Sequence, residues 1–228
     1  PNMTVLWITD DRSLNAQTIS KIHQASGGGI DMNQIRYLGE EDHRTLEPGL
    51  IYFVHIQAMQ KNSTLHATRP DGTHNDRRTY GGWDMIANTV RERGEDFLVI
   101  WDEAHRGSGT KGTERKSIAG TIVGGGVTNI GTIQPAAPIV LGISATPDRF
   151  VAAMDAADRT MRPVEVKAGE VRESGLLKDR ILLRSVGESQ TADNTMLALA
   201  VEDLKGTDAA WRTHHETTGD RLVEPLLV

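Results

Sequence analysis

The chain has 228 residues, which is enough for one sizeable domain with a buried core. It contains no cysteine, so disulfides, thiolate metal sites and cysteine nucleophiles are excluded. Its 25 Lys and Arg residues against 31 Asp and Glu residues give a net charge of −6, so any contact with nucleic acid must be local rather than driven by a global basic field.

The first half of the chain predicts alternating strands and helices. A strand covers residues 5–8, and Asp10 and Asp11 follow it as candidate caps of a helix. That helix carries the apolar residues Leu14, Ile19 and Ile22. Residues 50–56 form a second apolar strand, and the polar stretch 62–82 after it predicts an irregular insertion.

The next helix and strand are the clearest in the sequence. Apolar residues recur at i, i+3, i+4 and i+7 before Gly94, which predicts a helix ending there, with Trp83, Ile86, Ala87 and Val90 on one face. Residues 97–101 are a continuous apolar run, typical of a strand buried on both faces.

The second half has longer irregular stretches. The glycine-rich residues 107–131 predict a loop, and the uncharged residues 117–147 predict a loop followed by one buried strand at 139–143. A further strand is predicted at 181–183. A helix follows it, with Met196, Leu197, Ala200 and Leu204 as its apolar positions. Strands that alternate with helices predict an α/β fold with a mostly parallel sheet and flanking helices.

No apolar run approaches the roughly 20 residues that cross a bilayer, and the first residues lack a signal-peptide pattern. We therefore expect no membrane segment and a cytoplasmic location.

The strongest chemical signal is a pair of acids at the end of a strand. The strand 97–101 runs directly into Asp102, Glu103, Ala104 and His105. The carboxyl end of a parallel strand is where open α/β sheets bind ligands. Two acids there suit phosphoryl transfer, in which one carboxylate lies near Mg²⁺ and the other orients the attacking water. The alternative is a pair of solvated acids that caps the next turn.

A second signal follows the strand 139–143, which ends in Ser144, Ala145, Thr146 and Pro147. Small hydroxyl residues at a neighbouring strand end can form a hydrogen bond with His105 and so connect the acids to a moving partner domain. The alternative is an ordinary exit from a strand into a loop.

These residues resemble a family. Asp102-Glu103-Ala104-His105 resembles motif II, the Walker B box, of superfamily-two DEAD/DEAH helicases, and Ser144-Ala145-Thr146 resembles motif III. The segment 9–17 is similar to motif Ia, and His55-Ile56-Gln57 is similar to a Thr-Ile-Gln segment of restriction-type translocases, with His55 in place of the threonine. The segment 173–181 resembles Res subunits of type III restriction systems, which makes a Res-like restriction or phage-defence protein the favoured branch.

The resemblance implies a RecA-like (P-loop NTPase) fold and a motor that couples hydrolysis of ATP with Mg²⁺ to movement on double-stranded DNA. Asp102 would hold Mg²⁺ through water, Glu103 would be the catalytic base, and His105 with Ser144 and Thr146 would couple hydrolysis to domain motion. The DNA side would carry Arg12, Ser13, Gln17 and Gln57. A modification (methyltransferase) subunit is the implied protein partner.

The sequence lacks one part of such a motor. No G-x-x-x-x-G-K-[ST] phosphate loop is present. We therefore expect an internal fragment: residues 1–205 as a first RecA-like domain without its P-loop strand and with a gap in the sheet, and residues 206–228 as a linker and the first strand of a second domain. Such a fragment should not hydrolyse ATP by itself.

Two other interpretations stay open at this stage. The chain could be a degenerate RecA-like module that binds nucleic acid or protein without catalysis. It could also be an RNA helicase, which only the nucleic-acid surface would distinguish from a DNA motor.

Overall fold

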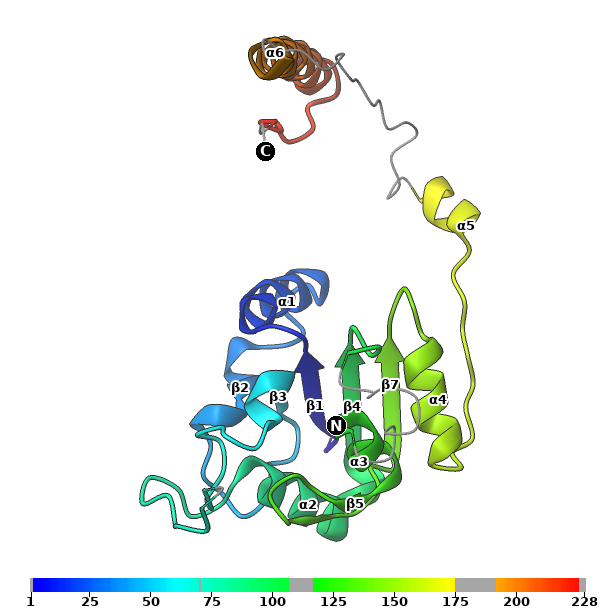
Figure 1. The fold of residues 1–228 in the computed structure, drawn as a ribbon. Helices are drawn as coiled ribbons and strands as arrows, with labels where there is room; N and C mark the ends of the chain where they lie inside the picture. Colours follow the sequence, from blue (N-terminus) through cyan, green and yellow to red (C-terminus); the bar gives the residue numbers. More distant parts are fainter. Residues whose placement is uncertain (1, 70, 107–116, 175–191, 226–228) are drawn as a thin grey trace. The chain divides into compact units, whose positions relative to one another are not determined.

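The fold was obtained as a computed structural model, which describes residues 2–69, 71–106, 117–174 and 192–225 (Figure 1). Internal contacts divide the chain into two compact units, residues 1–163 and residues 164–228. Each unit is described by itself.

The first unit is built on a five-stranded parallel sheet with the strand order β2-β3-β1-β4-β7. The strands are β1 (Thr4–Thr9), β2 (Ile35–Tyr37), β3 (Ile51–His55), β4 (Phe97–Asp102) and β7 (Ile139–Ile143). A separate antiparallel pair joins β5 (Gly126–Val127) to β6 (Ile133–Gln134). The parallel α/β fold predicted from the alternating pattern is confirmed. The predicted gap is not, because the five strands are hydrogen-bonded in one continuous order.

The helices of this unit connect the strands. They are α1 (Arg12–Ala25), α2 (Gly82–Arg93), α3 (Ile118–Gly124) and α4 (Asp148–Ala156), with short 3₁₀ turns η1 (Met32–Gln34), η2 (Leu38–Glu40), η3 (Ile56–Met59) and η4 (Gly94–Asp96). Helix α1 begins where the sequence predicts, because the Asp11 carboxylate accepts the backbone N–H of Ser13 at 2.8 Å.

The two faces of the sheet are covered differently. On one face, side chains such as Leu6, Val99 and Trp101 join α2, α3 and α4 in the main core. On the other face, α1 packs on β1 and β3, where Trp7 stacks on Phe53 with ring centroids 5.6 Å apart. No described helix covers this second face at β4 and β7.

This difference corrects two predictions about buried strands. In β7, the side chains of Ile139, Leu141 and Ile143 are 48%, 51% and 45% exposed, because β7 is an edge strand and they point to the uncovered face. In β4, alternate residues are fully buried and the others are only partly buried. An apolar run alone does not show whether a helix covers the second face.

A helix also forms where the glycine-rich sequence predicted a loop. The Ser117 hydroxyl accepts the backbone N–H of Gly120 at 2.9 Å and so caps α3. Ile122 and Val123 are then buried in the main core. A methyl group on Gly124 would lie 2.8 Å from the Cβ of Ala157, so the glycines there permit close packing of α3 against α4.

The irregular insertion predicted at 62–82 is confirmed up to the start of α2. Between η3 and α2, the described residues contain only one isolated bridge, Thr68 to His74. The insertion packs closely on α2, since a Cβ on Gly82 would lie 2.6 Å from the Leu65 side chain.

The second unit contains the helices α5 (Ala168–Glu173) and α6 (Ala192–Thr218). The predicted helix through Leu204 is confirmed, and it extends through the predicted boundary at residue 205 as far as Thr218. Residues 219–225 form no strand, and the predicted strand at 181–183 and residues 226–228 lie outside the described residues. The division of the chain into two RecA-like parts remains a prediction. Among the helices described, none is both long and apolar enough to cross a membrane.

Candidate active site

The candidate catalytic residues lie where two neighbouring strands end. Strand β4 ends at Asp102 and its neighbour β7 ends at Ile143. Beyond the strands, the backbone N–H of Ala104 donates a hydrogen bond of 2.9 Å to the carbonyl of Ile143. The acids after β4 and the hydroxyl residues after β7 therefore lie side by side.

His105 joins the two groups. Its Nδ1 atom lies 3.0 Å from the Ser144 hydroxyl oxygen and 3.2 Å from Oε2 of Glu103. The Ser144 oxygen also accepts the backbone N–H of Thr146 at 3.1 Å. One imidazole nitrogen thus touches both an acid of the first motif and a hydroxyl of the second.

The backbone turns sharply between the two acids. Glu103 has φ of 52°, in the left-handed region that residues other than glycine seldom occupy. Oδ1 of Asp102 accepts the Glu103 N–H at 3.0 Å, and the Glu103 carbonyl accepts the Arg106 N–H at 2.8 Å. These bonds hold Glu103 where its half-exposed carboxylate reaches His105.

A recess of about 420 Å³ lies next to this group, lined by His105, Arg106, Thr146, Asp148 and Arg149. Arg106 is placed by Asp10, whose carboxylate oxygen lies 3.7 Å from its Nε atom. Sequence reasoning did not select Arg106, Asp148 or Arg149. The signal for them was their position, since each follows within five residues of a motif at a strand end.

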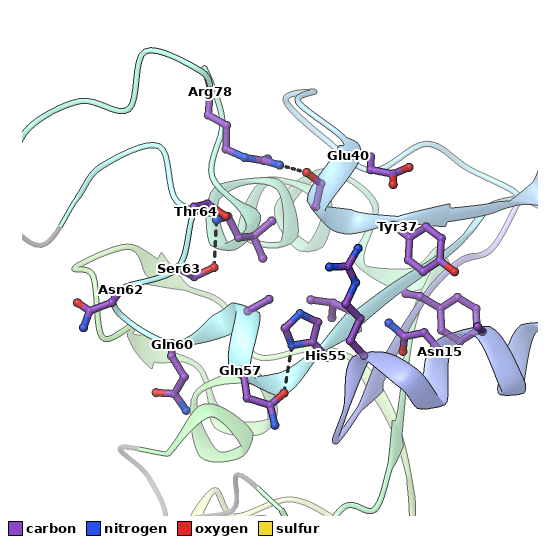
Figure 2. A pocket seen from close by; sticks show the side chains of 17 residues that line it. Asn15, Tyr37, Glu40, His55, Gln57, Gln60, Asn62, Ser63, Thr64 and Arg78 are labelled. Carbon is purple, nitrogen blue, oxygen red and sulfur yellow. Dashed lines mark hydrogen bonds between the residues drawn. The ribbon is translucent and has the colours of Figure 1, made fainter.

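The residues predicted to contact nucleic acid separate into two sets. Arg12 and Gln57 line a second, larger recess at the ends of β2 and β3 (Figure 2). Ser13 and Gln17 do not line it. The Ser13 hydroxyl instead donates to the Asp11 carboxylate at 2.7 Å, and these bonds from Ser13 lower the pKa of Asp11.

Comparison with protein families identifies the family of the chain. The family model described as "Type III restriction enzyme, res subunit" matches residues 1–149, which include both motifs. The chain belongs to the type III restriction enzyme res subunit family. This is a family of P-loop NTPases and helicases, so the predicted RecA-like fold agrees with the match. No curated protein matches the chain.

The chemistry that the Res family implies can be tested on the residues present. Asp102 is a half-buried carboxylate at a strand end, which suits a hard cation such as Mg²⁺ held through water. The described residues contain no group of three or more acids or histidines that could hold a metal by themselves. In the described part of the chain the acids could therefore form only part of a metal site, and other oxygen ligands would have to complete it.

Proposed function

We propose that this chain is part of the motor of an ATP-dependent DNA helicase or translocase, the Res-like subunit of a restriction or phage-defence system. The observation that carries the proposal is the contact of His105 with both Glu103 and Ser144. A pair of solvated acids that only capped a turn would not need a histidine shared with the next strand.

Each residue has a separate role in the proposed reaction. Glu103 accepts the proton of the attacking water, for which a half-exposed carboxylate is suited. Asp102 would hold Mg²⁺, which would supply positive charge to the phosphates.

His105 keeps the Glu103 carboxylate in place, and through Ser144 it connects that carboxylate to the backbone at Thr146. A change at one strand end is thereby passed to the other, which is how hydrolysis would be coupled to domain motion.

Double-stranded DNA is the proposed track, and the word "subunit" in the family description supports a protein partner, for which we propose a modification (methyltransferase) subunit. A motor of this kind acts on DNA in the cytoplasm.

The test is steady-state ATP hydrolysis by the parent polypeptide that contains this chain, with and without duplex DNA. We expect DNA to stimulate turnover and Glu103→Gln to reduce it by at least about a hundredfold, the lower range for loss of a general base. Glu95→Gln is the matched control, because Glu95 is exposed in η4, away from both motifs.

No turnover, or turnover that is indifferent to Glu103→Gln, would contradict the proposal and favour a binding module without catalysis. Stimulation of ATP hydrolysis by RNA and not by DNA would support a motor function but contradict the choice of DNA as its track.

A further inference from the structure

The larger recess of the first unit is a second candidate binding site, lined by charged, aromatic and amide side chains. Its volume is about 760 Å³, within the range of about 300–1,000 Å³ that holds small-molecule ligands. It lies at the carboxyl ends of β2 and β3, and the rest of its lining comes from α1, η2, η3, the segment 60–65 and Arg78. None of the acids after β4 takes part in it.

We infer that this recess takes one unpaired nucleotide of a DNA strand, with the base inside and its phosphodiester at Arg12. The inference rests on the proposed function and adds to it, because it assigns a place for a single base where the resemblance assigned Arg12 and Gln57 only to the DNA side.

The lining matches the chemistry of a base. Phe53 and Leu65 are buried and apolar, whereas the rings of Tyr37 and His55 and the amide of Gln57 lie around the recess (Figure 2). A base has an apolar face that stacks on rings and an edge that carries hydrogen-bond donors and acceptors, and amide groups can serve both kinds.

One amide is already oriented toward a ring. Nδ1 of His55 lies 3.1 Å from Oε1 of Gln57, so the imidazole and the amide are held together at the recess (Figure 2). The amide nitrogen of Gln57 has no hydrogen bond in the described part of the chain, which leaves it available to a ligand.

The charge of the lining favours a phosphodiester over a free nucleotide. Arg12 is exposed and makes no hydrogen bond or ion pair with the described residues. Arg78, the other arginine, is already used by the backbone carbonyls of Gly39 and Glu41. One available cation, in a lining that also contains the acid Glu40, suits the single charge of a phosphodiester better than the multiple charges of a free nucleotide.

The start of α1 does not provide a second phosphate site. The Asp11 carboxylate already occupies the N–H of Ser13 and adds its own negative charge. Arg12 is therefore the group that would attract the phosphate.

The wall of the recess is formed before any ligand binds. Asp42 accepts the backbone N–H of Thr79 at 2.9 Å and that of Tyr80 at 2.7 Å. Arg78 donates to the carbonyl of Glu41 at 2.7 Å. These bonds tie the insertion to the segment after η2, so the recess need not be ordered by its ligand, which favours binding.

The experiment measures binding of the 228-residue chain, without ATP, to two fluorescent single strands of equal length. One strand is oligo(dT) and the other has the same backbone with abasic residues. We expect the chain to bind oligo(dT) about tenfold more tightly, within the range measured for one base stacked on an aromatic side chain.

Variants test whether the preference for oligo(dT) arises in the recess. His55→Ala should abolish it, and His55→Phe, which keeps a ring, should retain most of it. His43→Ala should leave it unchanged, because His43 lies outside the recess and, among the described residues, forms only one ion pair, with Glu41 at 3.4 Å. Circular dichroism of each variant separates lost binding from lost folding.

Arg12→Ala tests whether Arg12 contacts the phosphodiester of the bound nucleotide. It should weaken binding to both strands and reduce the slope of log K against log salt by about 0.7, the value for one phosphate of a single strand.

Equal binding of the two strands by the wild-type chain would overturn the inference, as would a base preference that survives His55→Ala. Free thymidine monophosphate that binds in a His55-dependent way as tightly as the strand would overturn the choice of a phosphodiester. The binding assay contains no ATP, so the two proposals can fail separately. If ATP hydrolysis fails but the base preference is intact, the proposed motor function is rejected and the nucleotide site in the recess is retained. If hydrolysis succeeds but there is no base preference, only the nucleotide site is rejected.

Discussion

At the scale of single residues, the position of Glu103 follows from its backbone. Residues alternate along a strand, so two consecutive acids within a strand would point to opposite sides of the sheet. In the structure the strand ends at Asp102, and the left-handed φ of 52° at Glu103 separates the two carboxylates instead. Such a conformation costs of the order of 1–3 kcal/mol and is frequent at functional sites. It is held here by hydrogen bonds on both sides of Glu103.

His66 is the residue whose protonation should affect stability. It is 1% exposed, its Nε2 atom lies 2.7 Å from the Gln60 carbonyl, and its Nδ1 atom is buried with no partner in the described structure. Burial lowers the pKa of His66 below its usual 6.5, and of the nearby charges Asp84 opposes this shift and Arg78 adds to it. The folded chain therefore keeps His66 neutral at a pH where the unfolded chain protonates it.

We predict that the free energy of unfolding falls as pH decreases below 6.5, because the unfolded state then binds a proton that the folded state does not. Urea denaturation at pH 7.5 and pH 5.5 measures this fall. In His66→Asn the fall should be smaller, whereas in the control His43→Asn, at an exposed histidine, it should match wild type. An equal fall in His66→Asn and wild type would contradict the prediction.

At the scale of elements, the described residues of the segment 60–80 are held in place by hydrogen bonds although they contain almost no regular secondary structure. Within it, the Asn75 amide donates to the carbonyl of His66 at 3.0 Å, and its Leu65 carbonyl accepts the N–H of Gly82, the first residue of α2, at 2.8 Å. Asp42 connects it to the residues before β3, and the N–H groups of Tyr80 and Thr79 lower the pKa of the Asp42 carboxyl. Side chains here replace the hydrogen bonds that a strand or helix would supply.

We predict that Asp42→Ala opens this segment. Trypsin should then cleave after Arg77 and Arg78 at least about fivefold faster, the factor that corresponds to one lost hydrogen bond of about 1 kcal/mol, since cleavage follows the population of the open form. Mass spectrometry of timed digests measures the rate. The control is Asp71→Ala, because among the described residues the Asp71 carboxylate forms hydrogen bonds only with nearby Thr73. Equal cleavage in both variants would show that Asp42 does not hold the wall.

At the scale of the whole molecule, the hydrophobic core belongs to the first unit. Both described core clusters end by Met161, and the contacts place the division of the chain after Pro163. In the second unit, the side chains of Met196 and Leu197 on α6 are 52% and 59% exposed. The fold that positions both recesses therefore depends on the first unit.

We predict that a chain of residues 1–163 keeps the stability of the full chain to within about 0.5 kcal/mol, the usual effect of changes outside a core. Urea unfolding followed by circular dichroism measures it. A chain of residues 1–205 should have the same midpoint, whereas a chain of residues 1–143 loses the core side chains Phe150 and Met154 and should unfold. A large loss in 1–163 that is restored in 1–205 would instead support the domain boundary predicted from the sequence.

The sequence alone predicts four of the five strands of the main sheet, the helices α1 and α2, and the two motifs at strand ends. These depend on local patterns: apolar runs, helical periodicity, caps such as Asp11, and short strings such as Asp102-Glu103-Ala104-His105. Parallel pairing of β4 with β7 then brings Glu103, His105 and Ser144 together, as the motifs implied.

The helix α3, the exposure of β7 and the larger recess depend instead on tertiary contacts. The glycine-rich helix α3 is stabilised by burial against α4, and the exposure of β7 depends on which helices cover each face, so neither can be read from local composition. The larger recess joins Arg12, His55 and residues 60–65 through contacts such as Asp42 to Tyr80, 38 positions apart. Long-range contacts of this kind leave no periodic signal in the sequence, because each partner is an ordinary polar residue in its own neighbourhood.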